Sequence, residues 1–420
     1  METHLADFIR STPSGREAEA ILRRCVHCGF CNATCPTYQL TGDELDGPRG
    51  RIYQIKQVLE GAPASERNRV HLDRCLTCRA CETTCPSGVE YGRLLDIGRA
   101  TVLAQQPRRG RDALRRALLR AVLPQPRRFA IALGLGRLLR PLLPLLREKL
   151  PPARVAASSF VAARSSHPRR MLALAGCVQP SLTADTLPAA RALLDRLGIA
   201  LDVAPQAGCC GALALHLDDA DAARQAARRN IDAWWPGIEA GAEAIVITAS
   251  GCGVQVKDYG HLLGEDARYA GKAARIAGLA RDIGEVVAAE SAGLLPLLAA
   301  LPSLPAGSRR LAFHSPCTLQ HGQRIVGQVE ALLVAAGFEL VPVADAHLCC
   351  GSAGTYSLLQ PEWSNRLRAD KLAKLGAGGP ALIVSANVGC ITHLQGGTRL
   401  PVRHWVEVLA ERVERFAVYL

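Results

Sequence analysis

The sequence predicts an α+β protein of several domains, in which a helical, cysteine-rich N-terminal domain precedes two tandem α/β repeats. Three observations support this prediction. Eight cysteines between Cys25 and Cys85 form two copies of one motif, and a second set of cysteines recurs about 140 residues later in the C-terminal part. Around that second set, apolar β-branched runs alternate with helical patterns. A chain of 420 residues has room for two to four domains.

We expect four parts, with boundaries set by these cysteine patterns and by composition. They are a helical cluster-binding domain over 1–106, a basic Leu/Arg/Pro-rich connecting segment over 107–168, a first α/β repeat over 169–305 and a second over 306–420.

The eight N-terminal cysteines follow the pattern C-x2-C-x2-C-x3-C-P twice, with Pro36 and Pro86 closing the two copies. Bacterial ferredoxins with two [4Fe–4S] clusters use this motif, and in them the fourth cysteine of each copy binds the other cluster. The proline ends the cysteine loop and disfavours continued helix. We therefore expect two clusters with crosswise ligands. Cluster 1 takes Cys25, Cys28, Cys31 and Cys85, and cluster 2 takes Cys75, Cys78, Cys81 and Cys35.

Two other uses of these thiols fit less well. Zinc sites usually consist of two separated C-x-x-C pairs, often with histidine, whereas here each run has four cysteines and a proline. Disulfides belong to exported proteins, and we see no export signal before Cys25. Sixteen cysteines in such a chain indicate metal ligands in a reducing compartment.

Helical patterns surround the motifs. Residues 1–24 read as a helical lead-in, 51–60 as a helix after a turn at 47–50, and 92–106 as a helix that leaves the second motif. The helix expected over 51–60, between the two cysteine motifs, resembles that of α-helical ferredoxin domains. Arg49 and Arg51 either lie close to a cluster and tune its potential or cap the surface.

The connecting segment holds most of the net charge of +12. From Arg108 to Arg154 it has thirteen Lys and Arg but only Asp112 and Glu148 as acidic residues. Prolines interrupt its Leu-rich turns, and no run is long enough to span a membrane. We expect a basic amphipathic surface that lies on anionic lipid or a partner subunit; the alternative is a solvated linker. Nucleic acid is not expected, because no aromatic residues are interleaved with the arginines.

The C-terminal part is an internal duplication. Each copy predicts strand–helix–strand units, so we expect parallel sheets with their cysteines beyond the carboxyl ends of strands. In the first copy we expect one helix through Asn230, another around Trp234 and a strand that ends at Cys252, and in the second a strand that ends at Cys390. Gly211 and Gly351 permit close approach of the backbone. The candidate metal site of the first copy consists of Cys177, Cys209, Cys210 and Cys252; that of the second consists of Cys317, Cys349, Cys350, Cys390 and His393.

These copies resemble the cysteine-rich CCG domain of heterodisulfide reductase subunits, in which C…CCG…C-x-x-C binds an unusual iron–sulfur cluster. The sequence departs from that pattern, because Gln255 and His393 stand where the last cysteine is expected. An additional iron–sulfur cluster, zinc and a redox-active thiol pair therefore all stay open for these sites. His314, His321, Gln320 and Asn387 are polar neighbours of the second site, and each is more often structural than a ligand.

No dinucleotide-binding glycine motif, P-loop, Ser/His/Asp pattern or haem motif occurs. The sequence thus predicts electron-transfer centres but no cofactor that accepts a hydride. Such a chain needs a partner protein that binds the hydride-accepting cofactor. We expect no catalytic residue on this chain.

Over nearly its full length the chain resembles the iron–sulfur subunits of glycolate oxidase (glycolate dehydrogenase). The most specific stretches are DELDGPRGR, between the cluster motifs, NIDAWWPGIEAGAEAI and HLCCGSAGTY. The resemblance implies an oxidoreductase complex with two FAD-oxidase-like subunits, which hold the FAD and oxidise glycolate to glyoxylate. It also implies a membrane quinone as acceptor and a peripheral place on the cytoplasmic side of the inner membrane.

Two other functions stay open on the sequence alone. The chain fits the equivalent subunit of another FAD-linked dehydrogenase, acting on lactate, glycerol 3-phosphate or a heterodisulfide. A zinc-binding scaffold without electron transfer is the other alternative.

Overall fold

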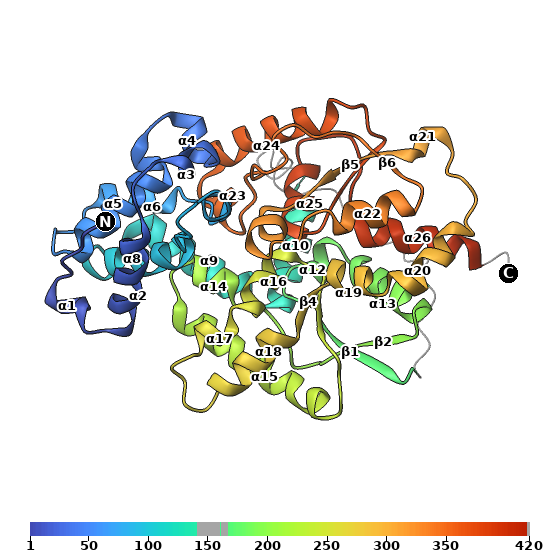
Figure 1. The fold of residues 1–420 in the computed structure, drawn as a ribbon, viewed down its shortest axis with the longest axis horizontal. Coiled ribbons are helices and arrows are strands. Elements are labelled where there is room, and N and C mark those ends of the chain that lie inside the picture. Colours follow the sequence, from blue (N-terminus) through green and yellow to red (C-terminus); the bar gives the residue numbers. More distant parts are fainter. Residues whose placement is uncertain (141–159, 161–166, 418–420) are drawn as a thin grey trace. The chain divides into compact units, whose positions relative to one another are not determined.

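The computed structural model describes residues 1–140, 160 and 167–417 (Figure 1). Its contacts form two compact units. The first comprises Met1–Ala117 together with His347–Leu367, and the second comprises Leu118–Ala346 together with Arg368–Leu420. The basic connecting segment expected over 107–168 lies partly outside the described residues, and its described part contains helices up to Leu139.

The N-terminal part of the first unit is entirely helical in its regular structure. Its elements are α1 (Asp7–Arg10), α2 (Pro13–Arg24), α3 (Phe30–Ala33), α4 (Pro36–Thr41), the 3-10 helix η1 (Glu44–Asp46), α5 (Pro48–Leu59), α6 (Glu66–Asp73), α7 (Ala80–Thr83) and α8 (Tyr91–Gln105). Local sequence explains their starts. The Thr12 side chain accepts from the Gly15 amide, and Ser65 forms a capping box with Asn68.

The helices expected over 1–24, 51–60 and 92–106 are all present, but the predicted turn at 47–50 is wrong. Pro48 is the first residue of α5, where its fixed φ favours the helix and its missing N–H is not needed. Apolar residues of α2, α5 and α8, among them Leu22, Ile55 and Leu94, form the buried core between these helices.

After α8 the chain forms α9 (Gly110–Val122) and α10 (Pro126–Leu139). Part of the arginine excess is structural. Arg108 and Arg116 pair with the largely buried Asp73 at 2.7 and 3.2 Å. Although burial raises the pKa of Asp73, these two arginines lower it below its ordinary value. None of the helices in the described part of the chain combines the length and apolarity that crossing a bilayer requires.

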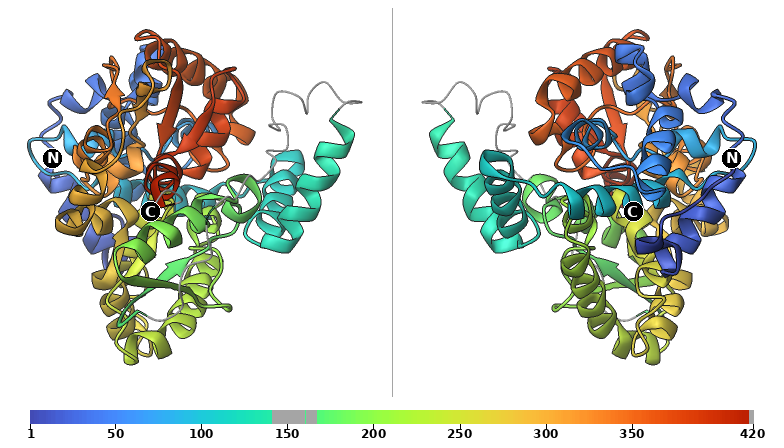
Figure 2. Two further views of the ribbon diagram at one scale, coloured as in Figure 1. Left: turned by 90° about the vertical axis from the view of Figure 1, so that its right-hand side faces the viewer. Right: turned by 90° about the vertical axis from the view of Figure 1, so that its left-hand side faces the viewer.

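The α/β part contains two four-stranded parallel sheets, which can be followed in Figure 2. The first has the order β2-β1-β3-β4, and the second has the order β6-β5-β7-β8. Their strands are β1 (Arg169–Leu174), β2 (Ile199–Val203), β3 (Ile245–Ile247), β4 (Ala280–Asp282), β5 (Arg310–His314), β6 (Glu339–Leu340), β7 (Leu382–Ser385) and β8 (Val402–His404). Every pairing is parallel, which confirms the predicted strand–helix alternation and the duplication.

Helices connect the strands in both repeats. The first repeat contains α12 (Gln179–Leu182), α13 (Thr186–Arg196), α14 (Ala212–His216), α15 (Ala220–Glu239), α16 (Ser250–Lys257), α17 (Tyr259–Leu262), α18 (Ala270–Leu279), α19 (Ile283–Ala289) and α20 (Ser291–Ala299). The second contains α21 (Ala306–Arg309), the π-helix η2 (Thr318–Gly322), α22 (Gln328–Ala335), α23 (Tyr356–Leu359), α24 (Pro361–Gly376), α25 (Val388–Gln395) and α26 (Trp405–Ala417).

Three local expectations are corrected. The two helices expected up to Asn230 and around Trp234 are one continuous helix, α15. The strands expected to end at Cys252 and Cys390 end earlier, and each of these cysteines lies in the first turn of the following helix. A fourth strand in each sheet, β4 and β8, was not expected, because three residues are too few to show a period.

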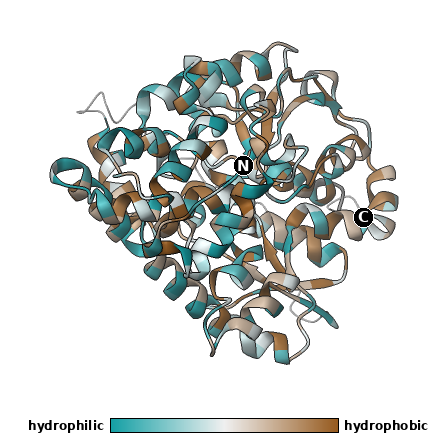
Figure 3. Ribbon diagram, turned by 60° about the vertical axis from the view of Figure 1, so that its left-hand side comes forward, coloured by the Kyte–Doolittle hydropathy of each residue, from teal (hydrophilic) through white to brown (hydrophobic). Residues whose placement is uncertain are grey.

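The two repeats share one hydrophobic core inside the second unit. Apolar strands fill the centre of each sheet (Figure 3), and residues such as Leu194 and Trp405 belong to a single buried cluster drawn from both repeats. Helices α13 and α26 pack together, and the buried Thr186 hydroxyl donates to Glu407 at 2.7 Å. The duplicated copies therefore fold as one body.

Candidate metal centres

The two N-terminal motifs share one backbone pattern. In each, the residue two after the first cysteine and the residue before the short helix have positive φ: His27 and Gly29 in the first copy, Thr77 and Arg79 in the second. Helices α3 and α7 then carry the third cysteine of each copy. This repeated left-handed winding directs successive thiols of one motif toward a common point.

Two cavities lie at these loops, and each draws thiols from both motifs. The first is lined by Cys25, Cys28, Cys31, Cys81 and Cys85. The second is lined by Cys35, Cys75, Cys78 and Cys81. The structure therefore brings together the two crosswise sets that the sequence predicts. Five thiols and His27 line the first cavity and four thiols line the second, and such thiol-rich sets suit iron–sulfur clusters.

Burial changes the acidity of these thiols. It raises the pKa of Cys31 to about 11, with help from the neighbouring Cys25, and it raises the pKa of Cys81 well above the usual value. Charges of the other cysteines of the same set add to the effect in both cases. A buried group of thiols that resists ionisation alone becomes a good ligand set when a bound cation compensates the charge.

The second cavity has hydrogen-bond donors that the sequence analysis missed. The Thr77 amide and the Tyr91 hydroxyl lie 3.4 and 3.7 Å from the Cys75 sulfur. Tyr91 stands at the start of α8, and only the packing of that helix brings it to the cavity. Hydrogen bonds to cluster sulfurs raise the reduction potential.

Arg51 and Arg49 lie near different cavities. Arg51 is only 1% exposed and lines the second cavity, where its guanidinium donates to the Thr37 hydroxyl and to the His71 carbonyl. The buried Asp46 accepts from His71 at 2.8 Å and pairs with Arg51 at 3.5 Å. Arg49 lines the first cavity and pairs with Glu44.

The four cysteines of the first repeat form a connected buried group. Cys209 accepts hydrogen bonds from Cys177 and Cys210, which lower its pKa, while Cys210 also interacts with Cys252. Two side chains from neighbouring helices hold the backbone of the CCG loop in place. The Asn230 amide donates to the Cys209 carbonyl at 3.0 Å, and the Tyr259 hydroxyl donates to the Cys210 carbonyl at 2.9 Å. All four predicted residues are thus brought together.

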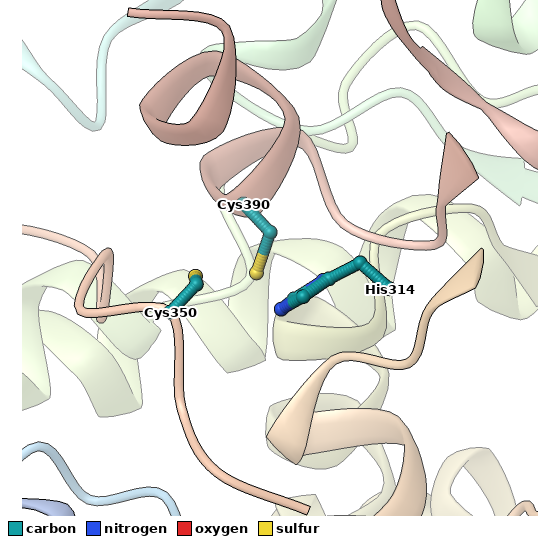
Figure 4. Close-up of side chains that lie close together, drawn as sticks. All are labelled: His314, Cys350 and Cys390. Atoms are coloured by element: carbon teal, nitrogen blue, oxygen red, sulfur yellow. The ribbon is translucent and has the colours of Figure 1, made fainter. Parts of the chain in front are cut away.

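In the second repeat the structure groups one imidazole with two thiols. The ligand atoms of His314, Cys350 and Cys390 all lie within 4.8 Å of one another (Figure 4). Burial, together with the charge of Lys371, lowers the pKa of His314 to about 3. His393, Cys317 and Cys349, which the sequence also predicts for this site, are not members of this group.

The glycines after the paired cysteines have positive φ in both repeats. An added Cβ at Gly351 would lie 2.6 Å from the Ser364 carbonyl oxygen, and one at Gly211 would lie 3.0 Å from that of Ala223. The close approach expected at these positions is therefore made by the following helices, α24 and α15.

Comparison with known proteins agrees with this architecture. A model described as 4Fe-4S dicluster domain matches residues 21–89. A model described as cysteine-rich domain matches residues 171–257 and 311–395.

Curated relatives extend the likeness to the whole chain. The glycolate oxidase iron-sulfur subunit of Escherichia coli is 51% identical over 99% of this chain and 100% of its own length. The probable glycolate oxidase iron-sulfur subunit of Bacillus subtilis is 29% identical over 91% of this chain and 90% of its own length. Lactate utilization protein A of Geobacillus thermodenitrificans is 28% identical over only 52% of this chain, although this covers 90% of that protein. The chain belongs to the family of glycolate oxidase iron–sulfur subunits.

Proposed function

We propose that the chain is the electron-transfer subunit of a glycolate oxidase complex. It receives electrons from an FAD-containing partner that oxidises glycolate to glyoxylate, and it passes them to a membrane acceptor, a quinone. The observation that carries this proposal is the pair of cavities, each lined by three thiols of one motif together with the fourth cysteine of the other. Cys81 lines both cavities.

In this proposal Cys25, Cys28, Cys31 and Cys85 hold one [4Fe–4S] cluster, and Cys35, Cys75, Cys78 and Cys81 hold the other. When bound, such clusters supply one-electron transfer at a potential set by charge, burial and hydrogen bonding. The residues of the chain adjust that potential differently at the two sites. Tyr91 and the buried Arg51 favour electron density on the second site, whereas the Arg49 charge at the first is partly compensated by Glu44.

Glycolate is favoured over lactate as the substrate of the complex by the extent of the likeness. The relatives named for glycolate oxidase match more than nine-tenths of the chain, whereas those named for lactate utilization match about half. The substrate itself binds on the partner, because the described residues include no flavin-binding or substrate-binding motif. Two FAD-oxidase-like subunits complete the complex in this proposal.

The cysteine groups of the two α/β repeats are further candidate centres, for an additional iron–sulfur cluster or for zinc. The chain would lie at the cytoplasmic face of the membrane as a peripheral protein. Helix α10 supports this placement, because it exposes Ile131, Leu135 and Leu138 on one side among several arginines. Such a helix suits an anionic lipid surface.

The first experiment measures iron and acid-labile sulfide per chain on anaerobically purified protein, with EPR after reduction. We expect about eight irons if the two N-terminal sites alone are filled, and about twelve if one repeat also holds a cubane. Little iron together with stoichiometric zinc would instead support the scaffold alternative.

A second experiment uses Cys28→Ser in the reconstituted complex. Glycolate should still reduce the partner flavin, while reduction of the quinone should be lost because the relay is interrupted. Ser87→Ala is the matched control, since Ser87 lines the same cavity without offering a thiol. Acceptor reduction at the full rate in Cys28→Ser would contradict the relay.

A further inference from the structure

We propose that electrons enter the chain at the first cavity, and that the FAD-containing partner covers an apolar surface around it. This entry surface consists of Val26, Phe30 and Tyr53, together with the exposed thiol of Cys28. The inference rests on the proposed function, because it needs a partner that carries a reduced flavin. It adds the face on which that partner binds and the order in which the two N-terminal sites are reduced.

Three large apolar side chains surround the first cavity and are open to solvent. Val26 is 68% exposed and Phe30 is 62% exposed, and both line the cavity. Tyr53, 48% exposed, comes from α5, and its ring lies edge-on to that of the cavity residue His27, with 6.0 Å between the ring centres. Single exposed apolar residues are common in proteins, but a group of them in one place marks an interaction site.

The second cysteine motif provides a comparison within the same chain. Leu76 and Ala80 stand fifty positions after Val26 and Phe30, at the same places of the motif. Leu76 is only 4% exposed and Ala80 only 1%. The two motifs share one backbone pattern, so a cluster-binding loop of this kind does not need exposed apolar side chains. Their exposure in the first motif therefore requires a separate reason, and a partner surface supplies one.

The thiols differ between the two sites in the same way. Cys28 is exposed, whereas Cys78, its counterpart in the second motif, is half-buried. Electron transfer slows steeply as the distance between donor and acceptor increases. A flavin on another protein can therefore approach the first site more closely than the second through this part of the surface.

Charges beside the entry surface favour a protein over a lipid membrane as its occupant. Arg24, which precedes Cys25, pairs with Glu90 at 2.9 Å. Arg49, which lines the cavity, donates to Glu44 at 3.1 Å. Because these positive charges are balanced within the chain, the surface offers an anionic membrane little attraction. Apolar and aromatic side chains with few unbalanced charges are typical of the centre of a protein–protein interface.

The second site is suited to take electrons from the first. Cys81 lines both cavities, so the two sites adjoin. The Tyr91 hydroxyl and the Thr77 amide are directed at the Cys75 sulfur, and such donors raise the potential of the second site. Oxidation of glycolate releases two electrons and two protons. The electrons cross the entry surface one after the other, and the quinone finally takes up both electrons together with two protons.

The first test measures how fast the glycolate-reduced partner reduces the clusters of the full-length protein, by loss of their visible absorbance at increasing partner concentration. Phe30→Glu and Tyr53→Glu should each raise the partner concentration needed for half the maximal rate about tenfold or more. Phe8→Glu is the matched control, because Phe8 is 53% exposed on α1 and does not line the cavity. It should leave this concentration unchanged. Iron content and EPR are compared for every variant.

The second test needs only the reduced wild-type protein and a water-soluble dysprosium chelate, which speeds the EPR relaxation of a cluster near the surface. We expect the chelate to act on one of the two N-terminal signals more strongly than on the other. The more affected signal should be the one that Cys25→Ser loses. Adding the FAD-containing partner should abolish the effect, because the partner covers the entry surface.

The outcomes separate this inference from the proposed function. Wild-type reduction kinetics in Phe30→Glu and Tyr53→Glu, with the clusters intact, would overturn the entry surface and leave the relay standing. An effect of the chelate that persists with bound partner would do the same. Failure of the partner to reduce the wild-type clusters at all would overturn both. If Phe30→Glu loses iron, Tyr53→Glu decides, since Tyr53 lies outside the cysteine motifs.

Discussion

At the scale of single residues, each N-terminal motif contributes its fourth cysteine to the cavity of the other. Cys35 follows Cys31 by four positions, yet it lines the cavity of Cys75, Cys78 and Cys81. The short helix α3 and the following turn separate Cys35 from the other thiols of its own motif.

This arrangement predicts which variants share a phenotype. Cys35→Ser and Cys81→Ser should lose the same EPR signal, and Cys85→Ser and Cys25→Ser should lose the other. Each loss follows from the removal of one of four ligands. The measurement is EPR of each reduced variant with an iron count. If Cys35→Ser instead matched Cys25→Ser, each motif would bind its own cluster.

Arg51 should be essential for the stability of the helical unit. Its removal leaves Asp46 without one of its cations and the His71 carbonyl without its donor, in a buried place. We expect Arg51→Gln to lower the free energy of unfolding by about 3–5 kcal/mol. Arg49→Gln, two residues away on the same helix, removes a partly exposed ion pair and should cost about 0–1 kcal/mol. Chemical denaturation of both variants checks this, and equal losses would contradict it.

At the scale of elements, the tight contact between the CCG loop and α24 depends on a glycine. Gly351 combines a φ of +87° with a carbonyl oxygen 2.6 Å from the position of an added Cβ. Gly351→Ala should therefore destabilise the protein by about 3 kcal/mol or more. Gly327 has a φ of +80° but open space around it, so Gly327→Ala should cost only about 1–2 kcal/mol. Comparable unfolding midpoints for the two variants would show that the close contact is unimportant.

Helix α10 predicts binding to anionic membranes. Ile131, Leu135 and Leu138 are exposed at intervals that place them on one side of the helix. Leu135→Glu should weaken binding of the full-length protein to anionic phospholipid vesicles about tenfold or more. Ala130→Glu introduces the same charge on another side and should have a smaller effect. Co-sedimentation at two salt concentrations measures this, and binding that does not weaken with salt would argue against an electrostatic contribution.

At the scale of the whole molecule, buried titratable groups make the α/β unit sensitive to acid. Burial lowers the pKa of His314 to about 3 and that of His404 to about 4. The unfolded chain binds protons at both residues below about pH 6.5 while the folded chain does not, so stability falls as the pH decreases from there toward 4. Asp282 has the opposite effect on stability. Burial raises its pKa to about 7, so the folded chain binds a proton there that the unfolded chain does not bind, and stability increases as the pH decreases.

The two histidines and the one aspartate together leave a net effect of one proton. The free energy of unfolding should therefore fall by about 1.4 kcal/mol for each unit by which the pH decreases between 6.5 and 4. His404→Gln should bring this slope close to zero, since its side chain can still donate to the Thr248 carbonyl that His404 contacts at 2.8 Å. Urea denaturation across this pH range measures the slope. An unchanged slope in His404→Gln would exclude His404 as a source of the acid sensitivity.

The sequence by itself determined the cysteine motifs, the duplication, the parallel α/β class and the main helices. These features depend on short-range patterns: spacing of thiols, period of apolar residues and the properties of Gly and Pro. Strands of three residues, such as β4 and β8, and the unbroken helix α15 were missed, because their residues show no period and their limits depend on packing against neighbours.

Only the tertiary structure decided which donors meet. Tyr91 reaches Cys75 and Arg51 reaches the His71 carbonyl, although the two residues of each pair are 16 and 20 positions apart. The imidazole grouped with two thiols is that of His314 and not that of His393. The sequence alone does not distinguish one histidine near a cysteine motif from another. Their roles are separated by burial, by the hydrogen bond that fixes one ring nitrogen, and by the direction of the side chain, and these are properties of the folded chain.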